Sequence, residues 1–276
     1  MTILSGAGQS RNLIDYAILG WRDIVDGARY WRLCHLLATA DTRRRFARSR
    51  LGQFWIMLSS AIYITAIGIV WSQLWHQPPQ EILPYVAVGM MVWQLISSII
   101  IDATTALQVS SNFFLNQYTS TAAILYAVIY RNLFIFSLNM IFPLLICLAF
   151  GIRFDAFSLM SLVGLLLLVI TGIWIAFVVA IFCARFRDIV QIVSSIVQII
   201  FFLTPVLWKA ELLPPESRVI VDWNPFAVLV SIVRDPLVGR PVPTIHWAAA
   251  CLLAFGGLIA TLPFFGRYRR RIVYWL

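Results

Sequence analysis

The stretch from Leu51 to Gln80 contains no Asp, Glu, Lys or Arg, and this limits how the chain can fold more than any other feature. A helix needs about 20 predominantly apolar residues to cross a bilayer, and this stretch is long enough. Charged residues make up 12% of the 276-residue chain, whereas soluble domains carry about 25%. We therefore interpret the chain as an integral membrane protein.

Six apolar runs have the length of a membrane-spanning helix, so the predicted fold is an all-α membrane protein with six transmembrane helices. Their predicted ranges are 51–74, 84–101, 122–150, 156–183, 189–207 and 244–265. Five arginines between Arg43 and Arg50 precede the first run, and the tail after Gly266 is basic again. Since positive residues favour the cytoplasmic side, both termini are expected in the cytoplasm, and an even number of spans agrees with this.

The chain is expected to form one membrane domain over residues 1–276, with an N-terminal segment (1–50), a six-span core (51–266) and a basic cytoplasmic tail (267–276). In the N-terminal segment, an apolar face at helical spacing is formed by Trp21, Ile24, Ala28 and Trp31. This pattern predicts an amphipathic helix that lies in the headgroup plane. A solvated helix that packs on a partner protein is the alternative.

Two stretches do not fit a simple series of spans. Thr104–Thr121 is cytoplasmic by the predicted topology, yet it is uncharged and rich in aromatic and amide side chains. It is interpreted as a docking segment for another protein, with a buried helix packed on its own chain as the alternative. Arg131 lies inside the third apolar run, where a charge costs about 2.5 kcal/mol or more unless it is paired or wetted. Asp102 is its predicted partner in an intramembrane ion pair.

Several kinds of chemistry lack their sequence signatures. The three histidines and four cysteines are scattered without metal-ligand spacing, so neither a metal site nor a catalytic site is predicted. A phosphate-binding Walker loop needs Gly-Lys, but the only lysine, Lys209, follows Trp208. If the protein works by ATP, the ATPase is another polypeptide. The net charge of +9 is interpreted as topology-determining and lipid-contacting, and no nucleic-acid partner is expected.

The order of four sequence features resembles the membrane subunit of type-2 ABC exporters, in particular permeases that export O-antigen, capsule or teichoic-acid polymers. The features are the basic stretch Arg43–Trp55, the linker Thr104–Tyr118, the turn Arg185–Ile189, and a closing signature in which Thr204–Trp208 is followed by Asn224-Pro225-Phe226 and Arg234. The resemblance covers most of the chain, and the last two features in this order are its most specific part.

This resemblance implies a half-transporter in the inner membrane of a bacterium. Two copies of the chain would enclose a passage for a lipid-linked polysaccharide, and two copies of a separate ATPase subunit would dock beneath them. ATP and Mg would be bound by that subunit, so the chain itself would hold no cofactor. The residues implied to meet the ATPase are Asn112, Phe113, Phe114, Asn116, Arg185, Arg187 and Asp188. Short re-entrant helices between the fifth and sixth spans would form the outer gate.

Aromatic rings stack on the apolar faces of sugars while still allowing them to slide. The residues predicted to line the passage or its gate are Trp71, Trp75, Tyr85, Trp93, Phe201, Phe202, Pro205, Trp208, Asn224, Pro225 and Phe226. The alternative is that many of these rings pack against lipid or neighbouring helices.

Three other functions remain open on the sequence alone. A type-2 permease for lipids or drugs is the nearest alternative. A membrane-embedded transferase or hydrolase would need clustered acidic residues, for which Glu211, Glu216 and Asp222 are the candidates, although they are interpreted as solvating a loop. A secondary transporter is disfavoured because few charges lie inside the spans.

Overall fold

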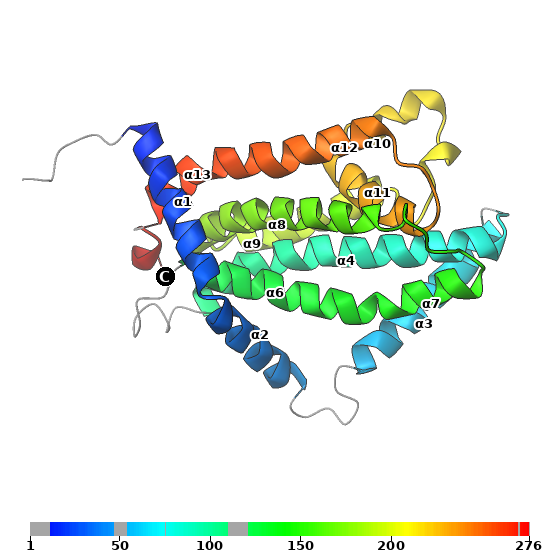
Figure 1. Ribbon diagram of the computed structural model, residues 1–276, viewed down its shortest axis with the longest axis horizontal. Helices are drawn as coiled ribbons and strands as arrows, with labels where there is room; N and C mark the ends of the chain where they lie inside the picture. Colours follow the sequence, from blue (N-terminus) through cyan, green and yellow to red (C-terminus); the bar gives the residue numbers. More distant parts are fainter. Residues whose placement is uncertain (1–11, 47–53, 75, 110–120, 270, 276) are drawn as a thin grey trace, which may run out of the picture.

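The computed structural model describes residues 12–46, 54–74, 76–109, 121–269 and 271–275, and within these ranges every regular element is helical (Figure 1). The α-helices are α1 (Leu13–Arg29), α2 (Trp31–Phe46), α3 (Phe54–Leu74), α4 (Pro79–Val109), α6 (Thr121–Asn139), α7 (Ile141–Ala149), α8 (Met160–Arg185), α9 (Ile189–Leu203), α10 (Val219–Asp222), α11 (Pro225–Leu237), α12 (Thr244–Cys251) and α13 (Gly257–Tyr268). Short 3-10 turns occur at Ala210–Leu212, Pro215–Ser217 and Ile272–Tyr274.

Each predicted apolar run corresponds to helical structure. Among the described residues, four segments are long and apolar enough to cross a membrane: Pro79–Val109, Thr121–Ala149, Met160–Arg185 and Thr244–Tyr268. Two shorter apolar helices, Leu58–Leu74 and Ile189–Leu203, correspond to the first and fifth runs. The chain is therefore a helical multi-pass membrane protein.

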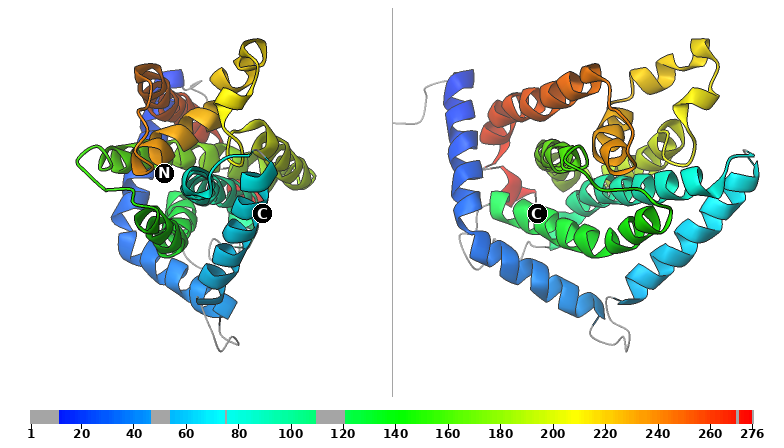
Figure 2. Two further views of the ribbon diagram at one scale, coloured as in Figure 1. Left: turned by 90° about the vertical axis from the view of Figure 1, so that its right-hand side faces the viewer. Right: turned by 45° about the vertical axis from the view of Figure 1, so that its right-hand side comes forward.

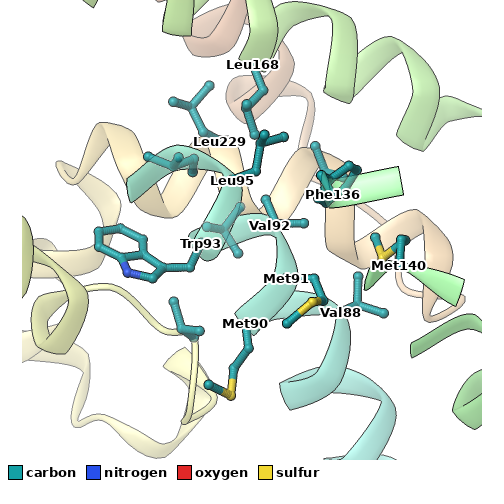
Figure 3. Close-up of a cluster of buried hydrophobic side chains, with 14 of the residues drawn as sticks. Val88, Met90, Met91, Val92, Trp93, Leu95, Phe136, Met140, Leu168 and Leu229 are labelled. Carbon is teal, nitrogen blue, oxygen red and sulfur yellow. The ribbon is translucent and has the colours of Figure 1, made fainter. Parts of the chain in front are cut away.

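The helix α4 forms the centre of the molecule. Every residue from Ile82 to Trp93 is buried, as expected for a helix that is surrounded by protein on all sides. Figure 3 shows part of this core, with side chains of α4 meeting Phe136 of α6, Leu168 of α8 and Leu229 of α11. Lipid tails are as apolar as these side chains, so close packing contributes more to the stability of this core than exclusion from water does.

Two of the predicted spans contain a local break. The third run divides into α6 and α7 at Met140 because Pro143 lacks an N–H and its ring clashes with the carbonyl of Asn139. The sixth run passes through a π-helical turn at Leu252–Gly256 between α12 and α13. The indole Nε1 of Trp174 donates a hydrogen bond to the Leu253 carbonyl (3.0 Å), so a side chain of α8 satisfies a carbonyl in this turn.

The helix α1 lies across one end of the bundle, roughly perpendicular to the long helices (Figure 1). It packs on α6 and α13. A Cβ atom on Gly20 would overlap the Leu262 carbonyl, and a Cβ on Gly266 would overlap the Tyr16 carbonyl, so these two glycines allow α1 and α13 to touch through their backbones. The turn between α8 and α9 and the end of the chain lie at this same end of the bundle.

The N-terminal segment contains a helix at the predicted position, and of its predicted apolar face only Ile24 packs on the chain. The buried residues of α1 are Gly20, Ile24 and Gly27. Trp21 and Trp31 of the predicted apolar face are exposed, by 51% and 63%. The apolar exposed side of α1 is continued by Leu13, Ile14 and Ile18.

The opposite end of the bundle contains the segment between α9 and α12. Its main element is α11, whose residues Ala227–Arg234 are all buried. This helix packs against α4, α8 and α12, as Figure 2 also shows. The burial explains why this segment is more apolar than a free loop.

Candidate functional site

A groove between α3, α4 and α9 is a candidate site, with a volume of about 790 Å³. Its residues are Ser59, Ser60, Tyr63, Met90, Met91, Trp93, Gln94, Ser97, Ile101, Val197, Gln198, Phe201 and Phe202. The amides of Gln94 and Gln198 lie on its wall with both side chains exposed. Amides that face lipid would remain unsatisfied, so these two residues indicate a surface that water, a ligand or another protein covers.

One face of α9 stays exposed from the groove toward the start of the helix. Gln191, Ser195, Gln198 and Phe202 recur at four-, three- and four-residue spacing, and all four are exposed. The hydroxyl of Ser195 donates to the carbonyl of Gln191 (3.1 Å). The helix α9 therefore carries a polar stripe within an otherwise apolar sequence, and the protein does not cover this stripe.

Aromatic side chains connect the groove to the core. Trp93, which is 8% exposed, lies 5.6 Å from Phe201 and 6.1 Å from Phe226 between ring centroids. Phe201 in turn lies 5.3 Å from Phe202, which is 71% exposed. Four of the predicted passage residues thus form one continuous row from α11 to the open surface of α9.

The segments Thr204–Trp208 and Asn224–Phe226 are joined by hydrogen bonds. Asn224 Oδ1 accepts from the Phe226 backbone N–H (2.9 Å) and so caps α11. Its Nδ2 donates to the Thr204 hydroxyl (2.9 Å), at the end of α9. Pro225 occupies the first turn of α11, where a missing N–H costs nothing. One asparagine therefore connects the end of α9 to the start of α11.

Arg234 fixes α11 to α4 at a buried position. It is 3% exposed, and its Nη1 donates to the Pro205 carbonyl (2.6 Å) while its Nε donates to Asp235 (2.8 Å). Its guanidinium lies 3.7 Å from the ring centroid of Tyr85 on α4. Three kinds of contact thus compensate for the burial of this charge.

A second cavity of about 550 Å³ surrounds these residues at the same end of the bundle. Lys209 pairs with Glu81 on α4 (2.9 Å), and Arg240 pairs with Glu211 (3.8 Å). Glu211 therefore pairs with Arg240 in the loop that follows α11. It does not belong to an acidic cluster that could catalyse hydrolysis. Sequence reasoning missed these two pairs, although a single lysine in an apolar chain is a usable signal.

Asp102, near the C-terminal end of α4, and Arg131, in the middle of α6, are in contact. Arg131 Nη2 lies 2.7 Å from Asp102 Oδ2, and the Asn132 amide donates to the same oxygen (3.0 Å). A small cavity of about 170 Å³ beside them is lined by Gln94, which also lines the groove. Asn132 was not predicted, and its position one residue after Arg131 gives no periodic signal.

The turn between α8 and α9 exposes three of the residues implied to meet an ATPase, Arg185, Arg187 and Asp188. Nearby, Asp23 of α1 and Arg269 form an ion pair of 3.0 Å. Burial raises the pKa of Asp23, and the Arg269 guanidinium offsets part of this effect. The predicted contact residues Asn112, Phe113, Phe114 and Asn116 lie outside the described residues.

The remaining passage candidates are distributed over the same half of the bundle. Tyr85 and Pro205 line the second cavity, whereas Trp71 packs against the core. Trp208 is half-buried, and its carbonyl accepts from the Tyr85 hydroxyl (3.4 Å). Trp75 lies outside the described residues. Among those described, no group of three or more His, Cys, Asp or Glu side chains could hold a metal ion.

The sequence profile of the ABC-2 type transporter family matches residues 32–238, which include the groove, the Asn224 cap and Arg234. The chain is also similar to the O-antigen export system permease protein RfbA of Klebsiella pneumoniae. The two are 22% identical over 239 residues, which cover 82% of this chain and 87% of that protein.

Proposed function

The chain belongs to the ABC-2 type transporter family, and from this premise we propose that it is the membrane subunit of an ATP-driven exporter of lipid-linked, O-antigen-like polysaccharide. Membrane subunits of this family are non-catalytic permeases, and nucleotide binding generally lies in their ATPase partners. The proposed complex contains two copies of this chain and two copies of a separate ATPase, in a bacterial inner membrane.

The proposed topology has six spans with both termini in the cytoplasm. The helix α1 lies in the headgroup plane at the cytoplasmic end, with Leu13, Ile14, Ile18 and Trp21 toward lipid. The outer end contains α11 as a re-entrant helix. Support comes from its burial beside α4 and α8, since irregular backbone at membrane depth must be enclosed by protein or line a wet cavity.

The polar stripe of α9 beside Gln94 and Ser97 of α4 is the observation that carries the proposal. When two copies face each other across this surface, their grooves enclose a passage lined by amides, hydroxyls and aromatic rings. Amides and hydroxyls match the hydroxyl groups of a sugar chain, and rings such as Phe202 match its apolar faces. The similarity to a protein named for O-antigen export supports a polysaccharide as the substrate.

The test is reconstitution with a separate ABC ATPase subunit, in vesicles that contain a lipid-linked polysaccharide. Gln94→Leu combined with Gln198→Leu is expected to lower polymer export at least tenfold while leaving the melting temperature unchanged. Ser137→Leu is the matched control because Ser137 is an exposed hydroxyl of α6 away from the groove. Export by the double variant at the wild-type rate would rule out this passage.

A related outcome separates the proposal from its nearest alternative. If the wild-type complex hydrolyses ATP and moves short lipids or drugs, but no polymer reaches the other side, the chain is a permease for lipids or drugs. Transport of polymer without any ATPase would contradict both.

A further inference from the structure

The last described residues fold back onto the turn between α8 and α9. Ile272 is fully buried in a cluster that includes Phe177, Ile181 and Ala184 of α8. The tail, defined here as residues 271–275, is therefore held against the inner end of α8 by an apolar anchor.

Trp275 of the tail contacts the first residue of this turn directly. The Arg185 guanidinium lies 5.1 Å from the ring centroid of Trp275 and 5.1 Å from that of Phe186. Trp275 also lies 5.9 Å from Tyr268 at the end of α13, and Tyr268 lies 5.0 Å from Phe264. The tail thus connects Arg185 to α13 through a row of aromatic rings.

The side chains that this arrangement leaves exposed are aromatic and mainly basic. Tyr274 is 87% exposed and Phe186 is 49% exposed. The arginines Arg185, Arg187 and Arg271 are also exposed, with Asp188 as the acidic residue of the turn. Exposed rings beside arginines are the composition of a protein interface, where Tyr, Phe and Arg are enriched.

We propose that the tail and the turn form one docking surface for the ATPase subunit, with Tyr274 and Phe186 as aromatic anchors. The excess of arginine selects an acidic surface on that partner, and Trp275 positions Arg185 within the interface. The proposal rests on the proposed function, because it requires a separate ATPase. A protein is favoured over an anionic lipid surface because Asp188 lies among the arginines and Trp275 is held between Arg185 and Tyr268.

The experiment measures how much ATPase remains with the full-length chain after affinity purification in detergent. Tyr274→Ala and Trp275→Ala are each expected to lower the retained ATPase at least fivefold, and Trp275→Phe is expected to restore it. Tyr30→Ala is the matched control, because Tyr30 is an exposed tyrosine between α1 and α2 that lies outside this surface. Equal melting temperatures show that the variants are folded.

A labelling experiment identifies what covers the tail. Tyr274→Cys, in a chain whose four native cysteines are replaced, is exposed to a maleimide in liposomes containing anionic phosphatidylglycerol. Added ATPase is expected to slow the labelling at least fivefold. Slow labelling in these liposomes before ATPase is added, but not in neutral ones, would identify lipid as the occupant and overturn the proposal.

The two proposals fail in different ways. If Tyr274→Ala and Trp275→Ala retain as much ATPase as the wild type, the docking surface is wrong while the transporter assignment stands. If the wild-type chain itself retains no ATPase, both are wrong.

Discussion

Arg131 on α6 donates from Nη2 to Asp102 Oδ2 on α4 across 2.7 Å, inside two candidate membrane spans. The side chains of Arg131 and Asp102 are 9% and 21% exposed. Because Asn132 donates to the same carboxylate oxygen, the contact belongs to a small polar network and not to an isolated pair. Sequence reasoning named the two charged residues as partners, and their side chains are in contact.

Removing both charges is expected to destabilise the protein by less than the two single removals added together. Asp102→Ala leaves a guanidinium without its carboxylate in a low-dielectric site, and such a loss costs about 3 kcal/mol. The same applies to Arg131→Ala. The double variant should lose clearly less than the sum of the two single losses, as measured by thermal unfolding in detergent. Strictly additive losses would mean that the pair does not stabilise the fold.

Gly266→Ala is expected to weaken the packing of α1 on α13, since the added methyl group overlaps the Tyr16 carbonyl. The expected loss is about 1–3 kcal/mol, the usual cost of overpacking. Gly256→Ala is the control, because its methyl group meets its nearest neighbour, Leu252, at an ordinary 3.6 Å. Faster protease cleavage within α1 in Gly266→Ala alone is the diagnostic measurement, and equal cleavage in both variants contradicts the argument.

The positions of the helices follow from the sequence because apolar runs of span length have few alternatives in a membrane. The turn at Phe186–Asp188 was predicted to within a residue, since α8 ends at Arg185 and α9 begins at Ile189. The composition and the spacing of charged residues are sufficient to place these helices and this turn.

The face on which α1 packs could not be read in the same way. The pattern assigned Trp21, Ile24, Ala28 and Trp31 to an apolar face in the headgroup plane; of these only Ile24 is buried, and Gly20 and Gly27 make the close contacts with the chain. Hydrophobic periodicity does not identify glycines as contact residues, because a glycine contributes by letting two backbones approach and not by an apolar side chain. The ion pair between Arg240 and Glu211 was missed for a related reason, because it depends on how a loop folds and not on spacing along the chain.

Arg234→Lys is expected to loosen the contact between α11 and α4. Lysine keeps the charge but cannot reach the Pro205 carbonyl and Asp235 together while lying on the Tyr85 ring. Loss of one charge-assisted hydrogen bond costs about 2 kcal/mol. Arg218→Lys, at an exposed site of the same outer segment, should change the free energy of unfolding by less than about 0.5 kcal/mol. Thermal unfolding compares the two, and equal stability contradicts a fastening role for Arg234.

Two substitutions at Asn224 separate its cap of α11 from the bonds that its Nδ2 donates to Thr204 and to the Leu203 carbonyl at the end of α9. Asn224→Ala removes both the cap of α11 and the bond to Thr204, and losing the cap alone costs about 1 kcal/mol. Asn224→Asp keeps the acceptor for the Phe226 N–H, and its negative charge is favourable at a helix N-terminus. It cannot donate to Thr204 unless it is protonated. The aspartate variant should therefore retain most of the stability that the alanine variant loses.

The transport rate then reports on the link between α9 and α11. If these helices move together as a gate, Asn224→Asp should lower polymer export at neutral pH although the protein remains stable, because the bonds it removes, to Thr204 and to the Leu203 carbonyl, both lead to the end of α9. Thr204→Val removes the first of these bonds from the other side and should lower export to a similar extent. Wild-type export in both variants would show that the link contributes to folding and not to the gate.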